Sequence, residues 1–177
     1  MITGVATFDL NQAHKALLRG FPSKHPFADG PRAWIGFECP GSAADVSPLH
    51  RAGVQPSCVV VCRDWDVDGR HVPALVGPAI VDHVPSPAIA EQIVRFLLEL
   101  HRAPDGYALC VHCHAGLWRS GAVAEFARVD LGATEPEASN RLVDVLVGGP
   151  WDGDRIYNRA LLRMMRAAHE ELRRSEP

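Results

Sequence analysis

A cysteine and an arginine six positions apart, Cys113 and Arg119, are the residues whose types and spacing most clearly suggest chemistry. An apolar run precedes this pair and another follows it, which predicts a strand, a loop and a helix. The N-terminus of a helix attracts anions, because its N–H groups are unpaired and the helix dipole is positive there. Arg119 would add a bidentate donor for phosphate. The same positive field favours the thiolate of Cys113, which is the nucleophilic form.

Other residues of this segment have expected roles of their own. Gly116 permits a positive φ or a close backbone approach at the bend of the loop. Ser120 can donate a hydrogen bond to the sulfur of Cys113 when that sulfur acts as a leaving group. We interpret His112 as a hydrogen-bonded packing residue that orients the loop, rather than as a base. We interpret Cys110 as a small, buried core residue.

The segment 112–120, His-Cys-His-Ala-Gly-Leu-Trp-Arg-Ser, resembles the HCxxGxxRS signature of the protein tyrosine and dual-specificity phosphatase superfamily, particularly its compact bacterial dual-specificity-like branch. The resemblance is strong from about Val59 to Ala133. It implies a metal-independent phosphatase that works through a cysteinyl-phosphate. By position, Cys113 is the nucleophile, Arg119 the clamp and Ser120 the assistant of the thiolate. The residues that the resemblance implies as the phosphate cradle are His114, Ala115, Gly116, Leu117, Trp118 and Arg119.

The reaction also needs a general acid, which protonates the leaving oxygen and later activates water. Asp82 is our first choice, because it ends a predicted strand and lies 31 residues before Cys113, a placement similar to that of the family's acid. Asp64, Asp66 and Asp68, in an acidic loop after another predicted strand, remain alternatives.

A metal site is the competing interpretation of the Cys/His-rich segment 110–114. A structural zinc ion needs four converging ligands. Along a strand, Cys110 and His112 would share one face while Cys113 points to the other, and a second ligand pair is missing. We therefore predict no metal and no cofactor.

The elements around this segment predict a single domain, residues 1–177, with an α/β fold and a mainly parallel central sheet flanked by helices. The resemblance makes this fold cysteine-phosphatase-like. Val59–Val61 is typical of a strand buried on both faces. Residues 1–32 are expected to be loosely organised apart from a short helix. The predicted strands are residues 33–37, 57–62, 79–81 and 107–111, and the predicted helices are residues 11–19, 47–52, 87–103, 121–129, 136–147 and 154–174, with Ser86 and Asn158 as caps.

Composition narrows the classes of function. The 177 residues carry a net charge of −3, so no basic field attracts nucleic acid. No apolar run approaches the ~20 residues that span a bilayer, and the first residues do not match the pattern of a secretory signal peptide. The five cysteines show no disulfide pattern, which fits a reducing compartment. We expect a cytoplasmic protein with no membrane or nucleic-acid partner, and the sequence leaves its oligomeric state open.

The function expected from these observations is hydrolysis of phosphomonoesters, either phosphotyrosine or phosphoserine and phosphothreonine in proteins, or a small phosphomonoester. The cradle contains no lysine, which argues against highly charged inositol phosphates. Two alternatives remain open. One is a weakly active or inactive phosphatase-like module that binds phosphorylated partners, and the other is a sulfurtransferase of the rhodanese kind.

Overall fold

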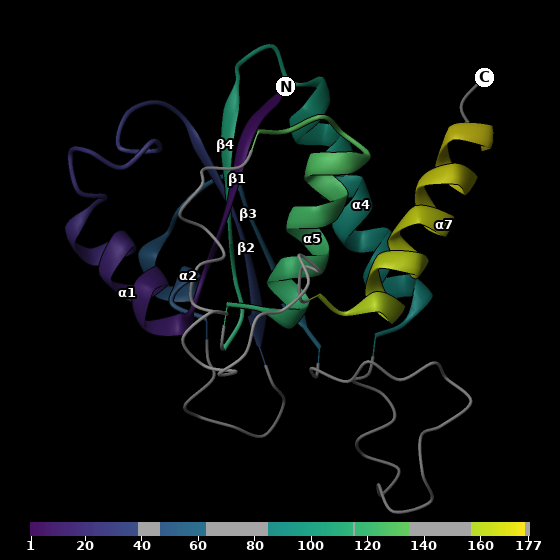
Figure 1. The fold of residues 1–177 in the computed structure, drawn as a ribbon, viewed down its shortest axis with the longest axis horizontal. Coiled ribbons are helices and arrows are strands. Elements are labelled where there is room, and N and C mark those ends of the chain that lie inside the picture. Colours follow the sequence, from purple (N-terminus) through teal and green to yellow (C-terminus); the bar gives the residue numbers. More distant parts are fainter. Residues whose placement is uncertain (39–46, 63–84, 115, 135–156, 176–177) are drawn as a thin grey trace, which may run out of the picture.

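Among the described residues, four parallel strands form the central sheet, in the order β1-β4-β2-β3 (Figure 1). The predicted α/β class with a parallel sheet is therefore confirmed. The strands are β1 (Ile2–Phe8), β2 (Arg32–Glu38), β3 (Ser57–Val61) and β4 (Tyr107–His112). The computed structural model describes residues 1–38, 47–62, 85–114, 116–134 and 157–175.

Helices cover both faces of the sheet (Figure 1). The short helices α1 (Leu10–Arg19) and α2 (Leu49–Ala52) lie on one face. The longer helices α4 (Pro87–Arg102), α5 (Trp118–Val129) and α7 (Arg159–Ser175) lie on the other. Parallel strands are joined by crossovers that place helices on the sheet faces, which accounts for this layering.

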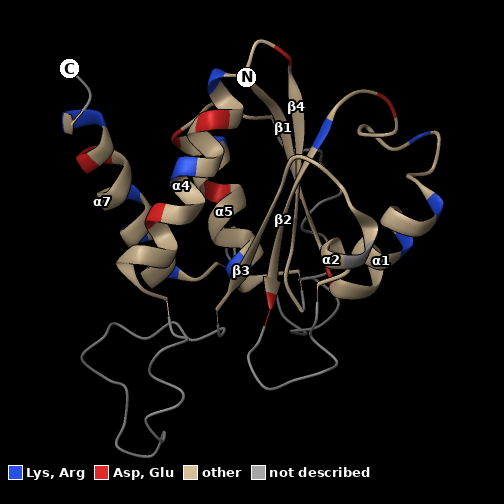
Figure 2. Ribbon diagram, turned by 180° about the vertical axis from the view of Figure 1, so that it is seen from behind, with Lys and Arg blue, Asp and Glu red and all other residues tan. Residues whose placement is uncertain are grey.

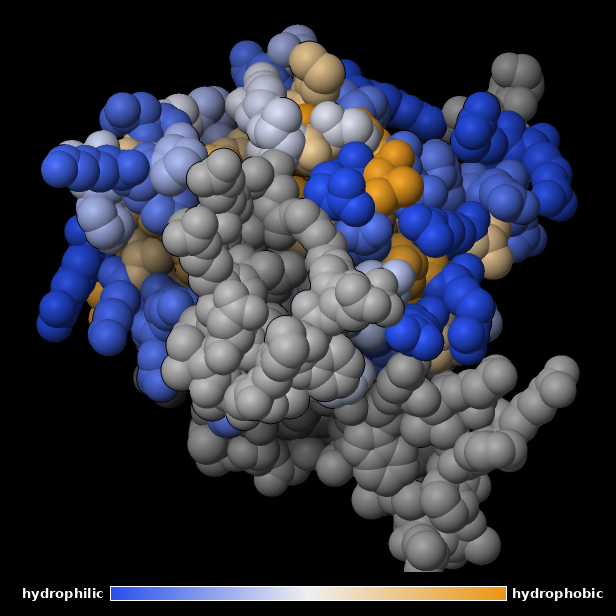
Figure 3. All heavy atoms as spheres, viewed as in Figure 1, coloured by the Kyte–Doolittle hydropathy of each residue, from blue (hydrophilic) through white to orange (hydrophobic). Residues whose placement is uncertain are grey.

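Each face of the sheet has its own apolar core, because successive side chains of a strand point to opposite faces. On β4, Leu109 and Val111 belong to the core beneath α4, α5 and α7. Ala108 and Cys110 belong to the smaller core beneath α1. Charged residues lie mainly on the helices and at strand ends (Figure 2), and the outer sides of α1 and α7 are hydrophilic (Figure 3).

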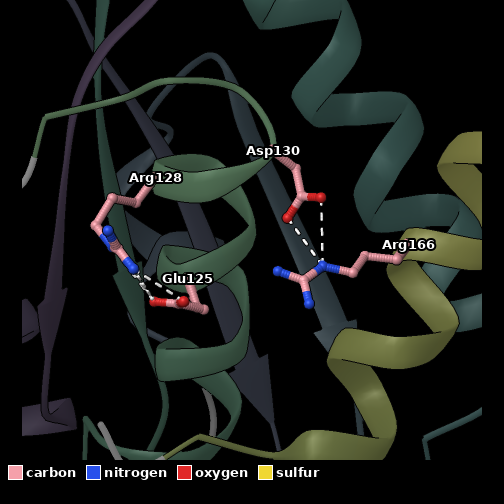
Figure 4. Close-up of polar contacts among 4 residues, drawn as sticks. All are labelled: Glu125, Arg128, Asp130 and Arg166. Carbon is pink, nitrogen blue, oxygen red and sulfur yellow. Dashed lines mark hydrogen bonds and ion pairs between the residues drawn. The ribbon is translucent and has the colours of Figure 1, made fainter. Parts of the chain in front are cut away.

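Two ion pairs lie at the C-terminal end of α5 (Figure 4). Asp130, the residue after α5, accepts from Arg166 of α7 at 3.1 Å. Within α5, Arg128 donates to Glu125 at 2.9 Å. Exposed pairs of this kind contribute at most about 1 kcal/mol each, so the buried apolar faces of α5 and α7 contribute most to their packing.

The start of α4 agrees with the sequence. Ser86 accepts from Ile89 N at 3.3 Å, and Pro87 occupies the first turn, as predicted.

Among the described residues, none of the helices has the length and apolar character needed to cross a membrane.

Two expectations about strands are wrong. The expectation for residues 1–32 is wrong at their start, because residues 2–8 form β1, which pairs with β4. Residues 20–31 contain no helix or strand, only turns and bends. The run Val59–Val61 is not buried on both faces. Among the described strands β3 lies at one edge of the sheet, and Val61 is 43% exposed. A short apolar run occurs both in strands that are buried on two faces and in edge strands that are covered on one face. Composition does not distinguish between these two cases.

Helix boundaries differ as well. The helix predicted at residues 121–129 begins earlier, at Trp118, inside the signature segment. The terminal helix predicted from residue 154 begins, in the described part of the chain, at Arg159. The strand predicted at residues 79–81 and the helix predicted at residues 136–147 lie outside the described residues.

Candidate active site

The carboxyl ends of all four described strands meet at one edge of the sheet, where ligands of parallel α/β proteins usually bind. Cys113 follows β4 at this edge, Cys62 follows β3, and Asp9 follows β1. α5 begins a few residues after Cys113, at Trp118. The predicted order of strand, loop and helix around Cys113 is therefore confirmed.

The thiol of Cys113 lies against the first turn of α5. Its Sγ is 3.2 Å from the Oγ of Ser120, and neither side chain is exposed to solvent. Either atom can be the donor in this contact. The expected proximity of Ser120 to the sulfur is therefore confirmed.

Arg119 is the largest fully buried side chain among the described residues, with 1% of its surface exposed. Its Nη1 donates to the carbonyl oxygen of Cys62 at 2.5 Å. Its guanidinium carbon lies 5.8 Å from the centre of the Phe37 ring. A buried cation requires hydrogen-bond or charge partners. These contacts hold the guanidinium near the ends of β2 and β3, on the same edge of the sheet as Cys113.

The loop after Cys113 packs on the junction between β1 and α1. Gly116 has a φ of +73°, and a Cβ atom there would lie 2.7 Å from the backbone nitrogen of Asp9. The backbone nitrogen of Leu10 donates to the carbonyl oxygen of His114 at 3.2 Å. Both expected roles of Gly116, a positive φ and a close backbone approach, are confirmed.

The residues that support the loop from β1 and α1 were not predicted as part of the site. A local signal for the start of α1 exists, since Asp9 and Gln12 form a capping box in which each side chain bonds to the other's backbone nitrogen. That pattern marks where the helix begins. It does not indicate that the junction lies against a loop more than 100 residues later.

His112 is buried on the opposite face of β4 from the thiol. Its Nε2 lies 2.7 Å from the Oγ of Ser47. Burial lowers its pKa to about 4, assisted by the positive charge of Arg119 and by His14. His112 is therefore neutral at ordinary pH. The interpretation of His112 as a hydrogen-bonded packing residue is confirmed, and so is that of Cys110, which is buried and whose thiol pKa is raised by burial.

Asn158 connects the start of α5 to the start of α7. Its side-chain oxygen accepts from Leu161 N at 2.9 Å, which confirms the predicted helix cap. Its backbone nitrogen donates to the carbonyl oxygen of Trp118 at 2.9 Å. The side chain is fully buried. Asn158 thus fixes α7 beside the turn of α5 that carries Arg119 and Ser120.

The remaining predicted site residues have varied positions. His114 is exposed, Leu117 is half-buried and Trp118 is 41% exposed. The candidate acid Asp82, its rivals Asp64, Asp66 and Asp68, and the cradle residue Ala115 lie outside the described residues. Within the described ranges, no group of three or more His, Cys, Asp or Glu side chains is arranged to hold a metal ion.

Comparisons with family models, with curated proteins and with solved structures found no match to this chain. The functional argument therefore depends on the arrangement of Cys113, Arg119 and Ser120 at the carboxyl end of the sheet.

Proposed function

We propose that this protein is a cysteine-dependent phosphatase that hydrolyses phosphomonoesters, with phosphotyrosine or phosphoserine and phosphothreonine of proteins as its substrates. The observation that carries the proposal is the 3.2 Å contact between Cys113 Sγ and Ser120 Oγ, on a loop that enters α5. The buried cation of Arg119 lies on the same turn of that helix. A nucleophile, a cation and a hydroxyl donor in this arrangement suit phosphoryl transfer through a covalent intermediate.

In the first proposed step, the thiolate of Cys113 attacks phosphorus. A sulfur–phosphorus bond forms while the bond from phosphorus to the leaving oxygen breaks. A general acid, for which Asp82 is our candidate, gives its proton to that oxygen. The guanidinium of Arg119 and N–H groups of the loop stabilise the charge on the other phosphate oxygens.

In the second proposed step, water attacks the phosphorus of the cysteinyl-phosphate. The carboxylate left by the first step takes a proton from this water, so the acid is regenerated. The sulfur–phosphorus bond breaks, inorganic phosphate is released and the thiolate returns. The hydroxyl of Ser120 donates to the departing sulfur and stabilises its negative charge.

The first test is hydrolysis of para-nitrophenyl phosphate with EDTA present, between pH 5 and 8. The wild type should turn over, and Cys113→Ser should abolish turnover. Cys58→Ser is the matched control, because Cys58 is half-buried on β3 and outside the loop, so this variant should keep wild-type activity. Undiminished turnover in Cys113→Ser would overturn the proposed nucleophile.

Access to the sulfur needs a second test, because the side chain of Cys113 is 0% exposed. The proposal requires that phosphate reach this thiol. Alkylation by iodoacetate, followed by peptide mass spectrometry, measures the reaction of each cysteine separately. Inorganic phosphate should slow alkylation of Cys113 and leave that of Cys58 unchanged. Equal rates with and without phosphate would contradict a phosphate site at this loop.

The same pair of experiments separates the phosphatase from a module that only binds phosphorylated partners. Protection of Cys113 by phosphate without any turnover would favour the binding module. Turnover together with protection would favour the enzyme.

A further inference from the structure

A polar network lies on the face of the sheet opposite to the thiol, at the carboxyl end of β2. Ser47 Oγ is 2.7 Å from His112 Nε2 and accepts from Leu49 N at 3.3 Å. The backbone nitrogen of Ser47 donates to Glu38 Oε1 at 2.7 Å. The same carboxylate oxygen lies 2.9 Å from His50 Nε2. Glu38 therefore holds the backbone of Ser47, and the hydroxyl of Ser47 reaches His112.

Gly36 provides the space for this contact. Gly36 is the neighbour of His112 across the β2–β4 pairing. A Cβ atom at Gly36 would lie 2.6 Å from His112 Nε2 and would also meet Ser47 Oγ. Real Cβ atoms essentially never come that close to other atoms. A side chain at this position would therefore separate the hydroxyl from the imidazole.

The hydrogen-bond inventory indicates which group donates. His112 is neutral, since its pKa is lowered to about 4, so only one of its ring nitrogens carries a proton. Among the described residues, Nδ1 has no hydrogen-bond partner. If Nε2–H donated to Ser47, both the hydroxyl proton and the Nδ1 lone pair would lack partners within the described chain. If the hydroxyl donates to Nε2, only Nδ1–H lacks a partner within the described chain. The second arrangement therefore leaves fewer buried polar groups without a hydrogen bond.

We propose that Ser47 is a positioning residue whose hydroxyl donates to Nε2 of His112, holds the ring in its Nδ1–H form and thereby fixes the end of β4 to which Cys113 is bonded. The consequence for turnover rests on the proposed phosphatase function. The consequence for His112 itself does not, and it can be measured in a protein that is not turning over.

The geometry explains how this contact acts on the loop. His112 is the last residue of β4, and its backbone pairs with both Phe8 of β1 and Gly36 of β2. Its side chain is clamped on one face of the sheet by Ser47, while the next residue presents its thiol to Ser120 on the other face. A fixed ring at His112 therefore limits rotation of the backbone from which Cys113 begins.

The first experiment measures the tautomer of His112 in the unmodified protein. Long-range ¹H–¹⁵N NMR at pH 7 distinguishes a protonated ring nitrogen from an unprotonated one. The expected result is a protonated Nδ1 and an unprotonated Nε2. A protonated Nε2, or a mixture of both forms, would overturn the proposal whether or not the protein is a phosphatase.

The second experiment compares turnover in Ser47→Ala and Ser47→Thr. Loss of one hydrogen bond predicts that Ser47→Ala lowers kcat by about two- to tenfold, with little change in KM, and that its His112 becomes a mixture of tautomers. Ser47→Thr keeps the hydroxyl, so it should restore both the wild-type kcat and the single tautomer of His112. Ser57→Ala, which removes a partly buried serine at the start of β3, is the matched control and should match the wild type.

The outcomes separate the two proposals. Wild-type kcat and a single tautomer in Ser47→Ala would overturn the positioning role while the phosphatase stands. If the wild type shows the Nδ1–H form of His112 but no turnover, the phosphatase proposal is contradicted and the assignment at His112 is supported. Should Ser47→Thr fail to fold, the wild-type spectrum still decides the assignment.

Discussion

Replacing Gly116 with alanine tests whether the loop after Cys113 is locked against the start of the chain. Two independent costs arise at this position. The first is conformational, because φ is +73°, in the left-handed region that residues with a Cβ avoid. The second is steric, because the new Cβ would lie 2.7 Å from Asp9 N and 2.8 Å from the carbonyl carbon of Phe8. Both neighbours are backbone atoms, which cannot rotate away as the end of a side chain can.

The magnitudes of the two costs can be worked out separately. A left-handed conformation costs a residue with a Cβ about 1–2 kcal/mol. Overpacking in a tight site costs about 1–3 kcal/mol more. Gly116→Ala should therefore lower the free energy of unfolding by about 2–5 kcal/mol. In a chain of this length, each kcal/mol shifts Tm by about 2–4 °C, so we expect Tm to fall by about 4–20 °C.

Gly132 offers a matched control for this measurement. Its φ is +74°, nearly the same as that of Gly116, but a Cβ there would have no atom within 4 Å. Gly132→Ala should therefore carry only the conformational cost, and its Tm should fall by about 2–8 °C. Thermal unfolding of the wild type and both variants, followed by circular dichroism, isolates the steric contribution as the difference between the variants.

Equal destabilisation of the two variants would refute the reasoning. It would mean that the loop yields freely and does not press on the junction of β1 and α1. Turnover is a second measurement that can be made on the same two variants. Under the proposed function, a displaced loop should reduce turnover of para-nitrophenyl phosphate in Gly116→Ala, whereas Gly132→Ala should keep wild-type turnover at temperatures well below its Tm.

Two further predictions concern titration and the general acid. The pKa of His112 is lowered to about 4 in the folded protein, against about 6.5 in the unfolded protein. Between these pH values the unfolded state binds more protons than the folded state. The free energy of unfolding should therefore fall by about 3 kcal/mol as the pH drops from 6.5 to 4. Urea unfolding at several pH values in this range measures how the free energy of unfolding changes with pH. His112→Gln, whose side chain does not titrate, should make this pH dependence weaker. An unchanged pH dependence in that variant would assign it to other groups. Asp82→Asn should lower turnover by roughly 10²–10⁴-fold if Asp82 is the acid. If Asp64→Asn or Asp66→Asn has that effect and Asp82→Asn does not, the acid belongs to the other loop.

Local patterns in the sequence were sufficient for the elements that carry the thiol. The apolar run before His112 predicted β4, and the apolar run after Ser120 predicted most of α5. The cap at Ser86 and the cap at Asn158 followed from the preference of short polar side chains for helix starts. These features depend on residues within a few positions of one another.

Contacts between distant segments could not be predicted in this way. The first strand was missed because Gly4 and two threonines interrupt its apolar pattern. Gly4 is suited to its place because the Phe27 ring and the carbonyl oxygen of Thr134 approach it closely. The contact from Arg119 to Cys62 joins residues 57 positions apart, and that from Ser47 to His112 joins residues 65 apart. No periodicity in a single sequence encodes such pairings.

The pairing of β1 with β4 also has a consequence for the order in which the protein assembles. Ile2 is in register with Tyr107, so a strand made early in synthesis has to wait for a partner about 100 residues further along. At ~5–20 residues per second, the ribosome needs roughly 5–20 s to produce that partner. Pairings this distant along the chain slow folding, because a long loop must close before its contacts form. Because Gly116 and His114 contact the β1–α1 junction, the thiol loop can reach its final shape only after this closure. Cys113 can therefore become buried beside Ser120 only after β1 and β4 have paired.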